Sequence, residues 1–344
     1  MEHARPQSAL MTGPALATTL MGSVRGYEQF LRQYGGMALV RKSQGDEVPA
    51  DELPHIPTAM ADRMFKIAAD AVATLRIWQR TKVVYDVDPT FMTELVETEE
   101  DVKFPARILR RLPHPNPMFV FPEPFRIHHG GETTLVRGFY TVGRHASLAM
   151  ASTVEVEDGW IETMAYAETV DDRGAVVNIH RFILPVPLST GDLSVSDLVA
   201  ETVKGVDRET VDAADDRHFT TRLATLIVTS LLYVCSDKPE IDVQKTPGRR
   251  PSKGRKKAAD RPVTIARVGW RLGKAISEFY ERIERLKDLG GVGPALRPHI
   301  RRGHPHTYRV GVGRWDRIVK WLAPMLVNAD DFGELAEGIV IPIE

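Results

Sequence analysis

The longest apolar stretch of the chain, residues 223–235, places the strongest restriction on how the chain folds. It spans 13 residues and includes Thr225, Thr229 and Ser230, whereas a helix needs about 20 predominantly apolar residues to cross a bilayer. We therefore expect a buried helix over residues 216–235 that is apolar on most faces and lies at the centre of a core. A chain of 344 residues has room for such a core, since it is long enough for one large or two ordinary domains.

Helical signals also occur before and after this segment. Apolar residues recur at helical spacing over residues 58–80 and again over residues 272–286, which predicts two amphipathic helices. Asp88 followed by Pro89 predicts the N-cap and first residue of a short helix that ends near Val96.

The middle of the chain is predicted to be β. Residues 105–124 are rich in proline and favour an extended connector, and Asp158-Gly159 is typical of a tight hairpin turn. A second hairpin is predicted around Gly311-Val312-Gly313-Arg314, near the end of the chain. The predicted strands cover residues 118–121, 135–142, 153–157, 176–184, 307–310 and 318–322.

Together these elements predict an α+β fold. An antiparallel β-sheet, made of a meander plus the C-terminal hairpin, is expected to pack with helices from the N-terminal and C-terminal thirds. We expect residues 1–22 to be poorly ordered. Residues 23–344 are expected to form a single α+β domain with a basic flexible loop at residues 244–262.

The charges of the chain are distributed unevenly, although the formal net charge is only −1. Residues 155–216 hold 15 acidic and 4 basic side chains, a balance of −11, whereas residues 244–321 hold 21 basic and 6 acidic side chains, a balance of +15. The basic part could bind nucleic-acid phosphates in a salt-dependent way, or it could dock on the acidic part or on an acidic partner.

The most basic segment covers residues 244–261, with eight Lys or Arg residues against one Asp. One interpretation is a solvated, disordered insertion. The alternative is a functional segment that contacts the phosphates of RNA through Lys253, Arg255, Lys256 and Lys257.

The densest group of chemically active side chains covers residues 297–308. If this segment is extended, His304 and His306 point to the same face, because strand side chains alternate. Two imidazoles could ligate a metal if His299 or a distant carboxylate supplied a third ligand, although Pro305 between them favours an edge or irregular strand. Alternatively, the arginines and histidines could bind a carboxylate, a phosphate or a peptide backbone. A third interpretation is that they only hold the hairpin against the acidic half of the chain.

Signals for catalysis are weaker. The chain has a single cysteine, Cys235, at the end of the most apolar helix, where a thiol is usually an inert small hydrophobe. Motifs for a nucleophilic serine or a nucleotide-binding glycine loop are missing from the sequence, and Gly269 and Gly273 lack a preceding strand signature. We therefore expect a binding protein more than an enzyme, with no cofactor. One cysteine and no visible secretory signal favour the cytoplasm, and no membrane partner is expected.

The most distinctive residues of the chain lie near its C-terminus. They form the motif Arg297-Pro298-His299-Ile300-Arg301-Arg302-Gly303-His304, His306, Tyr308, Gly311-x-Gly313 and Val319-x-Trp321-x-x-Pro324-x-x-Val327-Asn328. Earlier segments include Tyr233-Val234-Cys235 with Pro239-Glu240-Ile241, and Val268-Gly269 with Arg271-Leu272-Gly273. These residues resemble those of a family of type V-A anti-CRISPR proteins, borne by phages and plasmids, that suppress production of the effector nuclease. The likeness is most specific in the last 50 residues and extends in the same order from about residue 60 onward.

The resemblance implies a non-catalytic adaptor. Such a protein would recognise the N-terminal segment of the CRISPR effector nuclease, or another nascent protein, as it leaves the ribosome, and would cause loss of its mRNA. The ribosome or the mRNA would then be a further partner. Our hypothesis is that the recognition face of such a protein consists of Arg297, His299, Arg301, Arg302, His304, His306 and Tyr308, with Trp321 supporting it from the paired strand.

One position departs from the family. Where relatives tend to carry a Trp between the two histidines, this chain has Pro305, which would alter recognition if that Trp packs on the partner. Two other functions remain open: a metal-dependent ribonuclease using His299, His304 and His306, and a plasmid-encoded nucleic-acid-binding accessory protein.

Overall fold

The computed structural model describes most of the chain between residues 28 and 327. The described residues are 28–29, 31–33, 36–43, 47–53, 59–98, 101, 103–129, 132–143, 160–170, 176–188, 191–204, 214–244, 263–288 and 299–327. The predicted strand at residues 153–157, the Asp158-Gly159 turn, the N-terminal 22 residues and the basic segment 245–262 lie outside these ranges.

A seven-stranded mixed sheet forms the centre of the protein, and its strand order is β6-β5-β4-β3-β1-β9-β8. Its strands are β1 (Val83–Val87), β3 (Met118–His129), β4 (Glu132–Gly143), β5 (Trp160–Val170), β6 (Val176–Pro187), β8 (Ile241–Gln244) and β9 (Thr264–Val268). Three further two-stranded pairs join β2 (Phe104–Pro105) to β7 (Asp192–Leu193), β10 (His299–Arg301) to β13 (Met325–Val327), and β11 (His304–Val310) to β12 (Asp316–Leu322).

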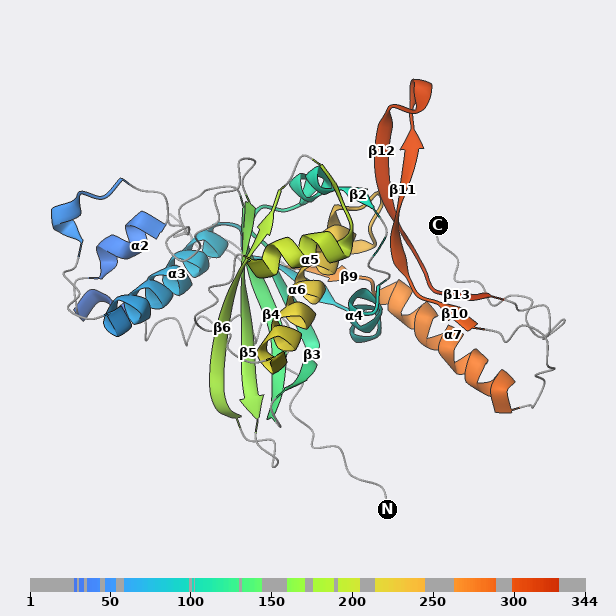
Figure 1. Ribbon diagram of the computed structural model, residues 1–344, viewed down its shortest axis with the longest axis horizontal. Helices are drawn as coiled ribbons and strands as arrows, with labels where there is room; N and C mark the ends of the chain where they lie inside the picture. Colours follow the sequence, from blue (N-terminus) through green and yellow to red (C-terminus); the bar gives the residue numbers. More distant parts are fainter. Residues whose placement is uncertain are drawn as a thin grey trace, which may run out of the picture.

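The helices surround this sheet (Figure 1). They are α2 (Met37–Ser43), α3 (Ala59–Thr81), α4 (Pro89–Val96), α5 (Val195–Lys204), α6 (Ala214–Cys235) and α7 (Trp270–Asp288), with short 3-10 turns η1 (Ala50–Glu52), η2 (Ala106–Arg111) and η6 (Val312–Arg314). The expected helices at 58–80, 216–235 and 272–286 are therefore confirmed as α3, α6 and α7. The short helix after Asp88 is confirmed as α4, and the Asp88 carboxylate accepts a 2.9 Å hydrogen bond from the backbone of Phe91, as an N-cap should.

The predicted meander is confirmed, but a wholly antiparallel sheet is wrong. Strands β3 to β6 pair in chain order and antiparallel, whereas β1 runs parallel to both β3 and β9. Buried strands in parallel pairs carry apolar side chains on both faces. The run Val83–Val87 therefore lacks the alternation that would have identified it as a strand.

Strand β3 is also longer than the predicted residues 118–121. It continues through Pro122 and Pro124 to His129, and its pairing with β4 shifts register between Val120 and Phe125. Proline cannot donate to a ladder, so strands carry it at edges or at bulges. The register shift places both prolines at such an irregularity.

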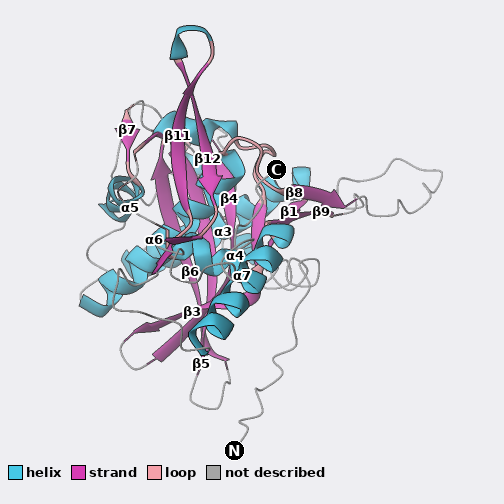
Figure 2. Cartoon of the chain, turned by 90° about the vertical axis from the view of Figure 1, so that its right-hand side faces the viewer, coloured by secondary structure: helices cyan, strands magenta, loops and turns pink. Residues whose placement is uncertain are grey.

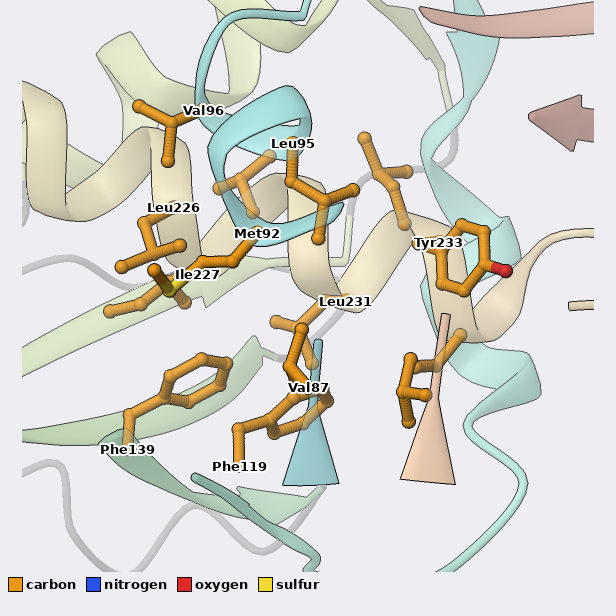
Figure 3. Close-up of a cluster of buried hydrophobic side chains, with 14 of the residues drawn as sticks. Val87, Met92, Leu95, Val96, Phe119, Phe139, Leu226, Ile227, Leu231 and Tyr233 are labelled. Carbon is orange, nitrogen blue, oxygen red and sulfur yellow. The ribbon is translucent and has the colours of Figure 1, made fainter. Parts of the chain in front are cut away.

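The sheet separates two apolar cores. On one side, Trp78 and its neighbours on α3 pack against Val84, Met118 and other alternate sheet residues. On the other side, Phe119 and Phe139 stack with ring centroids 4.4 Å apart, and Figure 3 shows them facing α6 residues such as Ile227. Helix α6 contains the apolar stretch of residues 223–235. Its stretch Arg217–Cys235 would be long enough to cross a membrane, but 83% of it is buried in the fold, as the sequence predicts.

The hairpin of β11 and β12 projects beyond the sheet and helices (Figures 1 and 2). It is longer than predicted, because pairing begins at His304 and Leu322 and ends at Val310 and Asp316. We call residues 304–322 the arm. Its base packs on α4 and α6, where the candidate functional site lies.

Candidate functional site

Strand alternation places His304, His306 and Tyr308 on one face of the arm, as the sequence predicts. The ring centroids of His304 and His306 are 6.5 Å apart, and those of His306 and Tyr308 are 4.6 Å apart. His304 is only 3% exposed, whereas His306 and Tyr308 are open to solvent. Only the outer part of this row can therefore meet a partner directly.

His304 is held in place by the chain just before it. Its Nδ1 lies 3.1 Å from the carbonyl oxygen of Arg302, and its Nε2 lies 3.4 Å from the guanidinium of Arg301. A guanidinium can only donate and a carbonyl can only accept, so these contacts fit an imidazole whose Nδ1 carries the proton. His304 thus fixes the conformation of the segment that leads into β11.

Trp321 lies on the opposite face of the arm, paired across the ladder with Pro305. It is buried, and its ring meets Phe91 of α4 and Tyr233 of α6 edge-on at centroid distances of 5.7 and 5.9 Å. Gly303 passes close over the indole, since a Cβ at that position would lie 3.1 Å from it. Trp321 therefore anchors the arm from behind and does not belong to the exposed face.

Pro305 lies on the other face of this strand. It is buried on the Trp321 side, away from the row of His306 and Tyr308. A partner that binds the exposed row would therefore not contact Pro305.

Arg302 is engaged with a buried carboxylate. Its Nη1 lies 3.7 Å from Oε1 of Glu94 on α4, and Tyr280 of α7 donates a 2.6 Å hydrogen bond to the same oxygen. Burial, with the bond to Glu94 second, raises the pKa of Tyr280, so its hydroxyl keeps its proton. This contact joins α4, α7 and the start of the arm.

A cavity of about 490 Å³ opens at the base of the arm. Its lining comes from the end of α6, the segment 236–240, the start of α7, and β12. The lining residues are Tyr233, Ser236, Asp237, Lys238, Pro239, Glu240, Arg271, Leu272, Ala275, Lys320, Trp321, Leu322 and Ala323. Its walls combine apolar side chains with charges of both signs.

Glu240 fixes one wall of the cavity. Its carboxylate accepts hydrogen bonds of 2.8 and 2.9 Å from the backbone N–H groups of Arg271 and Leu272, which are free donors at the start of α7. Its own N–H donates to the Tyr233 hydroxyl at 3.0 Å. A carboxylate at a helix N-terminus is electrostatically favourable, so the end of α6 and the start of α7 are joined at this residue.

Gly269, just before α7, and Gly273 within it explain how close that helix lies to α4. At Gly269, whose φ is 69°, a Cβ would stand 2.2 Å from the Phe91 ring, and at Gly273 it would stand 1.8 Å from the Asp88 carboxylate. Their spacing of four residues therefore serves helix packing. The expectation that no strand precedes them is wrong, because β9 ends at Val268, directly before Gly269.

Lys320 connects the cavity to the exposed face of the arm. It lines the cavity, its Nζ lies 3.9 Å from the Asp237 carboxylate, and the same Nζ lies 5.7 Å from the centroid of the Tyr308 ring. Cross-strand pairing also places it opposite His306. We call His306, Tyr308, Lys320 and the cavity the recognition surface.

Sequence patterns alone identify the histidine row but not the cavity. Residues 236–240 carry the pattern of a helix ending, and nothing local connects them with α7 or β12. The available signal is that the family-like segments Pro239-Glu240 and Arg271-Leu272, far apart in the chain, meet at this cavity.

Several predicted residues are not placed. Arg297 and the cations Lys253, Arg255, Lys256 and Lys257 lie outside the described residues, and for His299 only the backbone, paired with Val327 in β10, is described. Within the described ranges, no group of three His, Cys, Asp or Glu side chains could hold a metal ion. Burial raises the pKa of the Cys235 thiol to about 12, which keeps it protonated and fits the predicted structural role.

Comparisons with known proteins now bear on this arrangement. A profile described as AcrVA2-like, the anti-CRISPR type V subtype A2 family, matches residues 85–329. A solved structure described as the crystal structure of AcrVA2 is similar with a TM-score of 0.47 and 17% identity, over 90% of this chain and 98% of that chain. A search of curated proteins finds no match. The family match covers more than half of the chain and includes both the arm and the cavity. The protein therefore belongs to the AcrVA2-like, anti-CRISPR type V subtype A2 family.

Proposed function

We propose that the protein is a non-catalytic anti-CRISPR adaptor that acts in the cytoplasm. Its recognition surface would bind the N-terminal segment of a type V effector nuclease during synthesis and so cause loss of the mRNA. The observation that carries the proposal is the continuity of the cavity with the exposed row of the arm through Lys320. An extended peptide could place one side chain in the cavity while its neighbours lie along His306 and Tyr308.

The chemistry of the cavity supports a peptide as the ligand. Its volume of about 490 Å³ lies within the usual range of roughly 300–1,000 Å³ for small-ligand pockets. The aromatic ring of Tyr233 and the aliphatic Leu272 and Ala275 offer an apolar wall. The Glu240 carboxylate already binds the start of α7, and Asp237 lies 3.9 Å from Lys320. A peptide amine that enters the cavity would compete with Lys320 for Asp237.

The first experiment captures the tagged protein from cells that translate a type V-A effector, with and without puromycin to release nascent chains. We expect recovery of the N-terminal segment of the effector, together with its mRNA, and loss of the mRNA after puromycin. RNA retained regardless of translation, without peptide, would contradict the adaptor. Chelator-sensitive RNA cleavage by the pure protein would instead indicate the metal-dependent ribonuclease.

Matched variants test whether the recognition surface binds the captured peptide. The double substitution His306→Ala/Tyr308→Ala removes two exposed side chains of the row and should reduce peptide recovery at least ten-fold. His128→Ala is the control, since it removes another exposed histidine, at the distant β3–β4 hairpin where it contacts Thr133. Equal capture by both variants would place the peptide elsewhere.

A further inference from the structure

The tip of the arm presents two apolar side chains to solvent. Val312 is 98% and Trp315 is 86% exposed, the highest values among the large hydrophobic residues of the described chain. The arm carries them well beyond the sheet and helices (Figure 2). A tryptophan exposed at the end of a projecting hairpin is unusual for a purely structural residue, because its large apolar surface remains in water.

The turn at the tip has a defined geometry. Gly311 and Gly313 have φ values of 80° and 68°, and Arg314 adopts φ 57°, a conformation that costs a non-glycine residue about 1 kcal/mol or more. The Arg314 N–H donates to the Gly311 carbonyl at 3.1 Å. A Cβ at Gly313 would lie 2.6 Å from Nε1 of Trp315, so the indole rests against this glycine. The turn therefore holds the ring in place although it is exposed.

Positive charges line the face of the arm that lies opposite the recognition surface. Arg309 and Arg317 are directly paired across the two strands, although like charges in this position repel. Arg317 binds the Asp192 carboxylate at 2.5 Å. Arg309 and the tip residue Arg314 are exposed and make no ion pair with a described residue.

The same face continues onto the body of the protein. Thr307, one alternation below Arg309, donates a 2.9 Å hydrogen bond to the carbonyl of Lys103. Pairing of β2 with β7 places Asp192, the partner of Arg317, opposite Pro105, which lies in the chain between Lys103 and Arg107. We call Lys103, Arg107, Arg309, Arg314 and Arg317 the basic strip.

We propose that the basic strip and Trp315 bind single-stranded RNA, with a base stacked on the indole and the phosphates on the arginines. Sequence-tolerant binding of single strands combines an aromatic platform with a positively charged track, and the guanidinium fork matches phosphate oxygens. An acidic protein would neutralise the arginines, but it would not supply a flat base to stack on the indole of Trp315. Arg309 and Arg317 lie on the face of the arm opposite His306 and Tyr308, so the proposal does not rest on peptide recognition.

The test measures binding of a fluorescent single-stranded RNA of about 20 nucleotides to the pure full-length protein by anisotropy, at about 50 and 200 mM salt. Arg309→Gln/Arg314→Gln should weaken binding about ten-fold and reduce the salt dependence. Trp315→Ala should weaken binding at least about five-fold, the lower end expected for loss of one stacked base, while Trp315→Phe should remain within about two-fold of the wild type.

Two control pairs remove the same charge elsewhere. Lys274→Gln/Arg285→Gln takes two exposed cations from α7, where they pair with Glu278 and Glu281, and should leave binding within about two-fold. Lys256→Gln/Lys257→Gln takes two cations from the basic segment and should weaken binding less than the arm pair does. Thermal melting must show that every variant keeps the wild-type transition.

Four outcomes would overturn the proposal. The first two are failure of the wild type to bind RNA and RNA binding by the arm variants that equals that of the wild type. The third is a larger loss of RNA affinity from the basic-segment pair than from the arm pair. The fourth is that the protein binds polyglutamate or anionic vesicles more tightly than RNA and that this binding requires Trp315. Peptide capture by Arg309→Gln/Arg314→Gln should equal that of the wild type. Failure of RNA binding and failure of the proposed peptide function are therefore separate results.

Discussion

The hydroxyl of Tyr280 on α7 donates a 2.6 Å hydrogen bond to Oε1 of Glu94 on α4. Glu94 is only 2% exposed, and its second oxygen has no hydrogen-bond partner among the described residues. A buried carboxylate is costly unless it is hydrogen-bonded and paired. This contact, with Arg302 beside it, makes the burial of Glu94 tolerable.

Removing the Tyr280 hydroxyl should therefore destabilise the protein. We expect Tyr280→Phe to lower the free energy of unfolding by about 1–3 kcal/mol, because a buried acceptor loses its donor. Urea denaturation at neutral pH measures the change. Tyr308→Phe removes an exposed hydroxyl and should stay within about 0.5 kcal/mol. Equal effects of the two substitutions would contradict the assigned role of Glu94.

The two tryptophans of the arm should respond in opposite ways to truncation. Trp321→Ala should lower the free energy of unfolding by about 3–5 kcal/mol, because it leaves a cavity against Phe91 and Tyr233. Trp315→Ala should change it by no more than about 0.5 kcal/mol, since the ring lies in solvent. Thermal or urea unfolding of both variants tests the pair, and a large loss from Trp315→Ala would show that the tip packs on the body.

The two histidines of the arm should separate stability from binding. His304→Ala should destabilise the protein by about 1–3 kcal/mol, because the Arg302 carbonyl loses its buried partner. His306→Ala should leave the melting transition unchanged and reduce capture of the effector peptide. Circular dichroism melts combined with the capture assay distinguish the two effects, and a destabilised His306→Ala would show that the exposed row is structural.

A charge in the sheet should make stability depend on pH. Burial raises the pKa of Asp86 to about 6, while Arg267 opposes and Asp88 adds to the shift. The native state therefore binds more protons than the unfolded state between about pH 4 and 6, so stability falls as pH rises through this window. Asp86→Asn should stabilise the protein at about pH 8 and give no gain at about pH 4.

Urea titrations at both pH values test this expectation. Asp242→Asn on β8, which lies beyond β9 from β1, is the control, because that side chain is exposed and its neutralisation should have a small effect. A gain from Asp86→Asn that is the same at both pH values would show that charge is not the cause.

Local signals in the sequence predict much of the fold. The Asp88-Pro89 cap and the apolar spacing of residues 58–80 correctly predict α4 and α3, since each depends on residues near in sequence. Strands β1 and β9 are not predicted from such local signals. Each is a five-residue run, and their parallel pairing joins segments far apart in the chain, which no turn signal indicates.

The candidate site also has one part that the sequence predicts and another part that it does not. Period-two alternation in β11 predicts that His304 and His306 share a face, but it cannot show that His304 is buried, because burial depends on what the arm packs against. The sequence gives even less indication of the cavity. Glu240 and Arg271 are brought together by hydrogen bonds between the segment that follows α6 and the start of α7.

The place of β1 in the sheet also sets the order in which the protein can be completed during its own synthesis. Val83 pairs with Thr264, so one edge of β1 stays open until the ribosome has passed β9, whereas the meander from β3 to β6 can form much earlier. Open strand edges invite pairing with other chains. The cavity draws on residues between Tyr233 and Ala323 and is complete only after Ala323 has been synthesised. A product that stops before β9 would therefore carry the meander but have neither a closed central strand nor a recognition surface.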